Sequence, residues 1–314
     1  MLPMTETDAL SDVLEQVQVR GLVTGGFAAR GPWVSRGSVR HPLKLVALVA
    51  GSATVTVDGP GGAQGPIALA PGDVALLNHR TRLEVQSGSG EGEPTEYLPD
   101  SSFDSMAVAT ADRAVDDVLV GGWIEVDPSA MELLRAALPG VVHVRAARPS
   151  ASPLGDLVER LFDEAMSGRP GSAFALRQHG QLLLLEVLRA HLEQERPPVG
   201  WLRLLADDEL APALHLIHGR PGEAWGLVDL ARASGMSRTR FAERFRSVAG
   251  MPPLTYLSRW RMLLAQRALR DPQVRVGELA TRLGYGSDSA FSTAFKRELG
   301  ESPLQYRLRS RSAS

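Results

Sequence analysis

The sequence contains no cysteine, which excludes disulfide bonds, thiol catalysis and metal sites built on thiolates. It also has no run of about 18 apolar residues, so we expect no membrane-spanning helix and no membrane partner. Residues 1–13 lack the basic start and apolar stretch of a signal peptide. These absences together predict a cytoplasmic protein.

Lysine is nearly absent, since only Lys44 and Lys296 occur among 34 basic residues. The charge is also unevenly spread along the chain. Residues 201–314 hold 18 basic and 11 acidic side chains, a balance of +7, whereas residues 1–200 hold 16 and 25, a balance of −9. A basic C-terminal third on a mildly acidic chain is typical of a domain that binds a polyanion, and the arginine fork suits phosphates and guanine edges.

An internal repeat dominates this basic third. Residues 227–256 return as residues 276–306, with matching apolar, glycine, phenylalanine and proline positions. Such a repeat has to be interpreted before local propensities are considered. The matched positions in the first copy are Leu227, Leu230, Ala231, Gly235, Phe241, Phe245, Gly250, Pro253, Leu254 and Tyr256.

Each copy has the order of a helix-turn-helix unit. A short apolar helix ends at Gly235 or Gly284, where a positive φ is expected, and a serine, Ser237 or Ser287, then stands at the N-cap of the next helix. A single such hairpin would suit an ordinary helical domain equally well. The duplication and the basic charge favour nucleic-acid binding instead.

The second helix of each copy turns two phenylalanines inward and a polar face outward. Polar side chains on an exposed helix can read base edges, and arginine or serine near its start can hold phosphates. The candidate DNA-contacting residues of the first copy are Ser237, Arg238, Thr239, Ala242, Glu243 and Arg246. Those of the second copy are Ser287, Asp288, Ser289, Ser292, Thr293 and Lys296.

The repeat, and above all the run GYGSDSAFSTAFKRELGESPLQYR, resembles the paired helix-turn-helix domain of AraC/XylS-type transcription regulators. The resemblance implies two recognition helices in successive major grooves, joined by a long helix that we predict over Thr255–Leu269. On that connector, Arg259 and Arg261 are candidates for phosphate contacts or for a solvated face. Aligning the family's base-reading positions selects Thr239, Ala242, Glu243, Asp288, Ser289, Ser292 and Thr293.

Two of these positions are unusual for base reading. Ala242 offers only a methyl group, which suits thymine, and Asp288 repels phosphate unless it accepts a hydrogen bond from cytosine or caps its helix. The second copy is therefore expected to read fewer bases than the first.

The first half of the chain has a β pattern that follows a short helix predicted over Asp8–Val17. Runs of alternating or β-branched residues at 16–26, 42–59 and 65–79 are bounded by glycine or proline, and two more strands are expected near Ser105–Thr110 and Asp117–Ile124. A low-complexity loop is predicted between them at Ser87–Ser105. Short strands spaced in this way predict a small antiparallel barrel or sandwich.

The turn at residues 70–73, Ala-Pro-Gly-Asp, resembles the turn of cupin barrels. Together with the Gly200-Trp201-Leu202 start of the last segment, it resembles the subgroup of AraC-type regulators that carry an N-terminal cupin. Enzymatic cupins bind a metal through a cluster of histidines and a glutamate, whereas His41 and His79 stand alone here. We therefore expect neither a metal nor another cofactor.

A barrel mouth is a natural place for a small-molecule effector. Polar and aromatic residues near the predicted strand ends are candidates to line it, with a ligand-free surface as the alternative for each. These candidates are Trp33, His41, Lys44, Asn78, His79 and Arg82.

Residues 152–192 have helical periodicity, broken at Gly168, Pro170 and Gly171. The run Leu182–Leu185 covers every side of the second helix, which must then be covered all round. This pair is predicted to form a homodimer interface, as the resemblance also implies, or to be buried within one subunit. Residues 193–200 read as a charged, proline-containing linker.

The sequence thus predicts an α+β multidomain protein: a cupin-like antiparallel barrel at 1–125, a helical dimerisation segment with a linker at 126–196, and an all-α double helix-turn-helix domain at 201–314, with motifs at about 227–250 and 276–300. We expect a non-enzymatic, sequence-specific regulator that binds double-stranded promoter DNA under the control of a small molecule. RNA polymerase is a further candidate partner. The alternatives are a metal-dependent cupin isomerase or oxygenase on a DNA tether, and a ligand-independent DNA-binding regulator.

Overall fold

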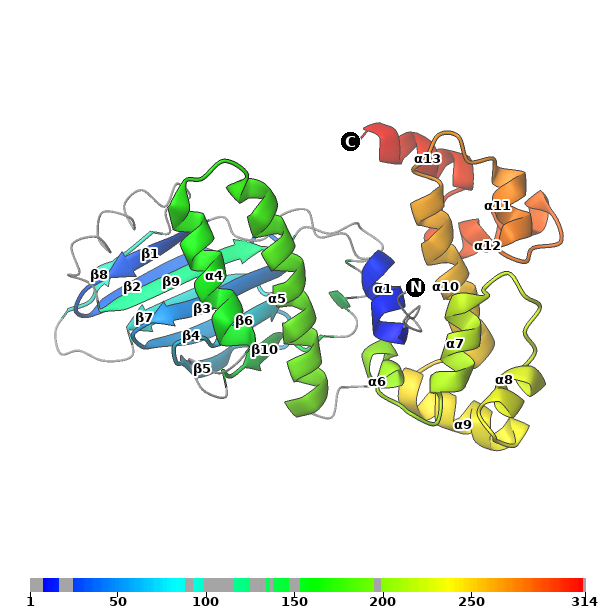
Figure 1. Cartoon of the computed structure of the whole chain (residues 1–314), viewed down its shortest axis with the longest axis horizontal. Helices are drawn as coiled ribbons and strands as arrows, with labels where there is room; N and C mark the ends of the chain where they lie inside the picture. Colours follow the sequence, from blue (N-terminus) through cyan, green and yellow to red (C-terminus); the bar gives the residue numbers. More distant parts are fainter. Residues whose placement is uncertain are drawn as a thin grey trace, which may run out of the picture. The chain divides into compact units, whose positions relative to one another are not determined.

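The protein was analysed as a computed structural model, in which the chain divides into two compact units (Figure 1). One comprises residues 19–196 and the other residues 1–18 with 197–314. The structure describes residues 8–16, 25–87, 93–98, 116–124, 131, 134–135, 138–146, 153–194 and 199–312.

The first unit contains two five-stranded sheets that enclose a common apolar core. One sheet has the order β1-β9-β3-β6-β10 and the other β5-β4-β7-β2-β8. Neighbouring strands in the described residues are antiparallel, apart from the short parallel contact of β2 with β8. The strands are β1 (Gly25–Ala29), β2 (Trp33–Ser38), β3 (Leu43–Ala50), β4 (Ala53–Asp58), β5 (Gln64–Leu69), β6 (Val74–Asn78), β7 (Arg82–Ser87), β8 (Thr95–Glu96), β9 (Asp117–Trp123) and β10 (Val141–Val144).

The core between the sheets follows from the alternation of the strands. Val46 and Leu48 of β3 and Leu77 of β6 point inward and are buried with Trp33 and Leu119. The runs predicted at 42–59 and 65–79 are confirmed as β3 to β6, and the strand near residues 117–124 is confirmed as β9. The strand predicted at 105–110 and most of the predicted loop lie outside the described residues.

Two helices cover one sheet of this unit. Helix α4 (Pro153–Ser167) packs on β3 and α5 (Ser172–Gln194) packs on β10, and the two helices form an antiparallel pair (Figure 1). The predicted break between them is confirmed, with Gly168 and Gly171 at positive φ. Within one chain, however, Leu182 is 49% exposed, because only one side of α5 faces α4 and the sheet.

The second unit is helical and contains both copies of the repeat. Its helices are α1 (Ala9–Gln16), α6 (Trp201–Leu205), α7 (Ala211–Gly219), α8 (Leu227–Ala233), α9 (Arg238–Ala249), α10 (Pro253–Ala268), α11 (Val276–Arg282), α12 (Asp288–Leu299) and α13 (Pro303–Ser312). The connector predicted over 255–269 is confirmed as α10. Helix α1, predicted ahead of the strands, packs on α7 and α10, where Val13 is buried.

Candidate functional site

The first helix-turn-helix consists of α8, a turn at Gly235 and α9. Gly235 has φ +62°, which a glycine adopts without a steric penalty, and Ser237 is the N-cap of α9. Ser237 Oγ accepts a 3.3 Å hydrogen bond from the Arg240 amide. Phe241 and Phe245 are wholly buried, so the rotation of α9 about its axis is fixed and its opposite face points to solvent.

The second copy repeats this geometry in α11 and α12. Gly284 has φ +78°, and Ser287 Oγ accepts a 3.1 Å hydrogen bond from the Ala290 amide. Phe291 and Phe295 are wholly buried, next to Tyr306 of α13. Both predicted serine N-caps and both predicted glycine turns are therefore confirmed.

The outward faces of α9 and α12 contain the predicted DNA-contacting residues. Most of these side chains are exposed, while Ala242 and Ser292 are half-buried. Arg238, Arg246 and Lys296 make no ion pair with any residue that the structure describes. Their positive charges are therefore available to an external anion.

The other arginines of α9 differ in this respect. Arg244 lies 2.9 Å from the Asp207 carboxylate and 2.6 Å from that of Glu209, and Arg240 lies 3.0 Å from Glu209. These pairs attach α9 to the segment between α6 and α7. The arginines of α9 therefore divide into two that are held in ion pairs within the unit and two that are available to a ligand.

Asp288 begins α12 and also lies against the start of α11. A Cβ added to Gly277 would be 2.9 Å from Asp288 Oδ2, so the carboxylate lies directly over the first turn of α11. Negative charge is favourable at helix N-termini. This placement favours a structural role for Asp288 beside α11, while the N-cap of its own helix is Ser287.

Arg261 of the connector α10 joins the segment between α7 and α8 to the turn of the second copy. Its Nε donates to the Pro221 carbonyl at 2.6 Å and its Nη2 to the Glu223 carbonyl at 2.8 Å, while the guanidinium lies over the Tyr285 ring. Burial lowers the pKa of Arg261. Arg261 is thus committed to contacts inside the unit, while Arg259 remains exposed, 3.9 Å from Glu298.

The six residues predicted to line a ligand site are not all together. Trp33 is wholly buried in the core, where its Nε1 donates a 2.7 Å hydrogen bond to Asp117. The His41 ring stacks on Trp123 with centroids 4.4 Å apart. Lys44 pairs with Trp123 across β3 and β9, and burial lowers the pKa of its amine. Arg82 begins β7 and is exposed.

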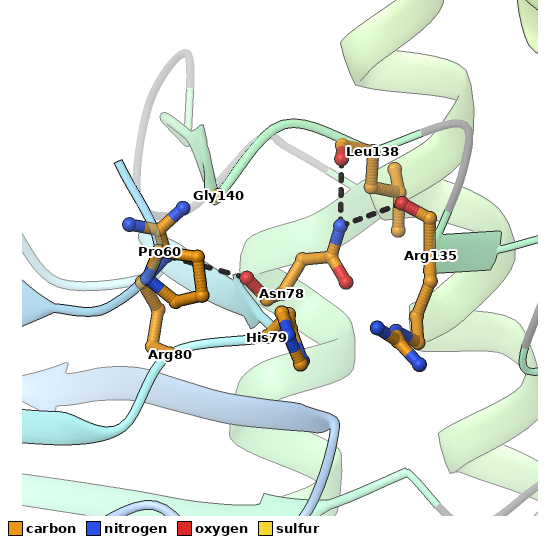
Figure 2. Close-up of a pocket in the computed structure, with 7 residues that line it drawn as sticks. All are labelled: Pro60, Asn78, His79, Arg80, Arg135, Leu138 and Gly140. Carbon is orange, nitrogen blue, oxygen red and sulfur yellow. Dashed lines mark hydrogen bonds between the residues drawn. The ribbon is translucent and has the colours of Figure 1, made fainter. Parts of the chain in front are cut away.

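Asn78 and His79 line a cavity of about 380 Å³ at the end of β6 (Figure 2). The other lining residues are Pro60, Arg80, Arg135, Leu138 and Gly140. Sequence reasoning did not select Arg80 or Arg135, because they stand 55 positions apart and no local pattern joins them. The lining chemistry is polar and basic, since the described residues around the cavity include no carboxylate.

The described residues contain no group of three or more histidine, aspartate or glutamate side chains close enough to hold a metal ion. Among the described helices, none combines the length and the apolar character needed to cross a membrane.

Comparison with known proteins assigns a family to each of the two parts of the chain. Residues 8–193 match the cupin family and residues 230–309 match the helix-turn-helix domain family. An AraC-like transcription regulator from Streptomyces lividans is 35% identical over 302 residues, which cover 96% of this chain and 98% of the relative. The HTH-type transcriptional regulator AlkR from Acinetobacter baylyi is 36% identical over 176 residues, covering 55% of this chain and 58% of the relative.

A solved structure also resembles the C-terminal part of the chain. The DNA-binding domain of AdpA, crystallised with a target DNA, is 37% identical and covers 34% of this chain and 96% of that domain, with a TM-score of 0.33.

Proposed function

The chain belongs to the AraC-like family of transcription regulators, with a cupin domain followed by a helix-turn-helix domain, and on this premise we propose that α9 and α12 contact operator DNA directly. It is a DNA-binding regulator and not an enzyme, since its full-length relatives are regulators. The observation that carries the proposal is the pair of exposed polar helix faces, each backed by two buried phenylalanines.

We assign different tasks to the residues of these faces. Arg238, Arg246 and Lys296 neutralise phosphates, and the capping serines, Ser237 and Ser287, lie near the backbone. We assign base reading to the remaining residues of these faces. Of these, Ala242 and Ser292 are half-buried and the others are exposed. The base-reading set is Thr239, Ala242, Glu243, Ser289, Ser292 and Thr293, with Asp288 in the structural role described above.

The phosphate assignment is tested by binding to a duplex from the regulator's own upstream region over a range of salt concentrations. Arg238→Ala should weaken binding to every sequence and reduce the salt slope by about one ion. Arg240→Ala is the matched control, because Arg240 is already paired with Glu209 and should leave the slope unchanged. Equal slopes for wild type and Arg238→Ala contradict the assignment.

Base reading needs a different measurement. Glu243→Ala should change the ranking of related sequences in a competition assay, since a carboxylate accepts a hydrogen bond from cytosine. A loss of the same size on every sequence would exclude Glu243 from base reading. Absence of any preference of the wild type for promoter over random duplex would refute the DNA-binding proposal as a whole.

We also propose that a small-molecule effector binds in the first unit and shifts the regulator between states that it binds unequally. The support is chemical: Lys44 is partly buried without an ion-pair partner among the described residues, next to the stacked rings of His41 and Trp123. An effector should raise the melting temperature of the chain. If no metabolite does so, the ligand-independent alternative is favoured.

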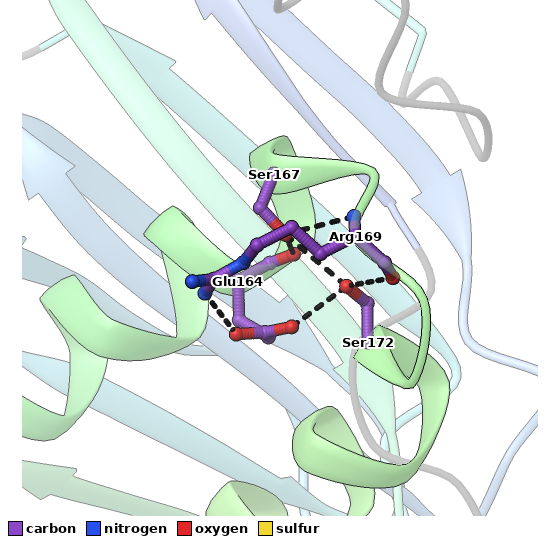
Figure 3. A network of polar contacts seen from close by, with 4 residues as sticks. All are labelled: Glu164, Ser167, Arg169 and Ser172. Carbon is purple, nitrogen blue, oxygen red and sulfur yellow. Dashed lines mark hydrogen bonds and ion pairs between the residues drawn. The ribbon is translucent and has the colours of Figure 1, made fainter.

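A homodimer through α4 and α5 is the assembly that we propose. Phe174 is 62% exposed and Leu182 is 49% exposed on α5, leaving an apolar surface that a second copy would cover. The hairpin is well fixed at its turn (Figure 3). Arg169 Nη2 lies 2.6 Å from Glu164 Oε2, and Ser172 Oγ lies 2.6 Å from Glu164 Oε1.

The dimer proposal is tested by mass measurement in solution. Leu182→Glu should convert the dimer to a monomer, whereas Glu93→Gln, an exposed change outside α4 and α5, should not. A wild-type monomer at micromolar concentration would contradict it. We propose in addition that the regulator acts in the cytoplasm and that it contacts RNA polymerase at its promoters.

A further inference from the structure

We infer that the cavity at the end of β6 binds a small hydroxylated oxyanion, such as a hydroxycarboxylate or a phosphate. Of the six residues predicted to line an effector site, Asn78 and His79 line this cavity, whereas His41 and Lys44 are not among its lining residues. The inference does not depend on DNA binding. It is carried by the charge of the lining, by one unpartnered buried atom and by the way the backbone fixes the site.

The lining supplies positive charge from different parts of the unit. Arg80 follows β6 and Arg135 lies in the segment before β10, while His79 lies between them (Figure 2). Arg135 is exposed and makes no ion pair with any residue in the described part of the chain. An anion would therefore meet arginine forks that no carboxylate of the lining neutralises.

Arg80 is held in position before any ligand arrives. Its Nε donates to the Asn78 carbonyl at 3.3 Å and its Nη1 to the Gly62 carbonyl at 3.4 Å. Its guanidinium also lies where a side chain on residue 140 would be, since a Cβ added to Gly140 would be 1.7 Å from Arg80 Nη2. The guanidinium occupies the space that glycine leaves open at residue 140, and its two hydrogen bonds orient the cation before a ligand binds.

Asn78 adds a requirement for a hydrogen-bond donor. The side chain is 5% exposed, and its Nδ2 donates to the Arg135 carbonyl at 3.0 Å and to the Leu138 carbonyl at 2.6 Å. Because both partners are acceptors, the orientation of the amide is determined. Its Oδ1 is then left buried with no hydrogen-bond partner in the described structure. Buried acceptors of this kind are rare and costly, so a ligand hydroxyl would satisfy this one.

Figure 2 shows this oxygen pointing into the space between the His79 ring and the Arg135 guanidinium. His79 is placed there by its backbone. It has φ +52°, in the left-handed region that non-glycine residues rarely adopt, and its amide donates to the Pro42 carbonyl at 2.8 Å. A strained residue of this kind is often kept at a binding site.

The geometry thus defines the chemistry of the ligand. Its negative charge would face the arginines and its hydroxyl would donate to Asn78 Oδ1. The volume of about 380 Å³ lies at the lower end of the range for small-molecule sites, and the lining is mainly polar. A small polar acid fits this description, and a lipid or an aromatic drug-like molecule does not.

The test is calorimetric titration of the full-length protein at constant ionic strength with three probes: glycolate, acetate and inorganic phosphate. Glycolate should bind about tenfold more tightly than acetate, since acetate lacks the hydroxyl that Asn78 needs. Phosphate carries both charge and hydroxyl, so its affinity relative to glycolate shows whether the natural ligand is a phosphate or a hydroxycarboxylate. No saturable binding of either glycolate or phosphate would overturn the inference.

Two variants place the binding in the cavity. Arg135→Gln should reduce affinity for the bound probe at least tenfold, while Arg160→Gln, at an exposed position of α4, should not. His79→Gly removes the imidazole from the cavity, so it should lower the affinity for the probe. Because glycine also relieves the left-handed strain, the melting temperature should not fall. Binding that both variants retain in full would place the anion elsewhere and overturn the proposal.

This experiment is separable from the test of DNA binding. Promoter binding by the same samples without anion should be unchanged, because the cavity residues belong to the first unit and the recognition helices to the second. Loss of the anion site alone would leave the DNA-binding proposal intact, and loss of promoter binding alone would leave the anion site intact.

Discussion

At the scale of single residues, the hydrogen bonds of buried polar atoms show which aromatic side chains stabilise the core rather than bind a ligand. Trp33 of β2 and Asp117 of β9 belong to different sheets, and their 2.7 Å hydrogen bond joins the two across the core. The second oxygen of Asp117 accepts a 2.7 Å hydrogen bond from the Ser52 amide. From the sequence alone, a tryptophan near a strand end is equally suited to bind a ligand. The hydrogen bond from the Trp33 indole nitrogen to Asp117 identifies its structural role instead.

His218 of α7 presents a similar case in the helical unit. Its ring stacks on Trp260 with centroids 4.1 Å apart, and its Nε2 lies 2.9 Å from the Tyr256 hydroxyl. Its Nδ1 lies 3.4 Å from the Asp12 carboxylate of α1. Burial, together with the nearby charge of His215, lowers the pKa of His218 to about 4.

A pH dependence of stability follows from this pKa. Between pH 6.5 and pH 4 the unfolded chain binds a proton at His218 that the folded chain does not, so stability should fall as the pH falls through this window and level off below it. The loss from this group between pH 7 and pH 5 is about 2 kcal/mol. Stability above pH 7 should not respond to this group.

Urea unfolding at pH 7 and pH 5 checks this expectation when wild type is compared with His218→Phe, which keeps the stacked ring but cannot titrate. The wild type should lose more stability than the variant over this interval. Equal losses would show that His218 does not titrate in the window, because other groups contribute to both proteins alike.

At the scale of elements, the repeat allows one substitution to be made in two equivalent places. Gly235 and Gly284 both have positive φ, but their surroundings differ. A Cβ on Gly235 would meet nothing within 4 Å, whereas a Cβ on Gly284 would lie 2.2 Å from the Gly222 carbonyl oxygen and 2.9 Å from Arg261 Nη2. The second turn therefore also packs against the segment between α7 and α8, which precedes the first helix-turn-helix copy.

Gly235→Ala should cost about 1–2 kcal/mol from the left-handed backbone alone. Gly284→Ala should cost at least about 1–3 kcal/mol more, because backbone atoms must move apart to admit the methyl group. Urea midpoints of the two variants measure the difference. Equal destabilisation would mean that the close contact between Gly222 and Gly284 adds nothing to the stability of this unit.

Most elements can be predicted from the sequence where the periodic pattern is long. The helices of both repeats, α10 and the strands β3 to β6 follow from spacing and turn residues. The four residues of β10 give too short a pattern, and its place beside β6 is set by tertiary packing. The exposure of Leu182 was also beyond prediction, since an all-apolar helix does not show which neighbours it has.

The candidate sites divide in the same way. The recognition helices are local in sequence, so their outward residues can be selected from one helical period. The cavity at β6 combines Arg80 with Arg135, and the unsatisfied oxygen of Asn78 exists only because two distant carbonyls occupy its amide nitrogen. No sequence pattern contains that information.

At the scale of the whole molecule, the chain passes twice between its two units. Residues 1–18 belong to the DNA-binding unit, residues 19–196 form the other unit, and the chain then returns at residue 197. Helix α1 is attached to α7 and α10 by the buried side chain of Val13 and by Asp12 beside His218. The first unit is therefore joined to the DNA-binding unit by two chain segments rather than one, and a change in the first unit can act through either of them.

The attachment of α1 depends on burial, because an isolated eight-residue helix is not stable in water. Val13→Asp places a charge against α7 and α10, and we expect it to release α1. Hydrogen exchange of the full-length protein measures this: amides of α1 should lose protection while those of α10 and α12 keep theirs. The same substitution at Val228, a half-exposed valine of α8, should leave α1 protected. If α1 stays protected in Val13→Asp, Val13 does not hold the helix. If α10 loses protection as well, α1 is an integral part of the fold of the DNA-binding unit rather than a separable attachment.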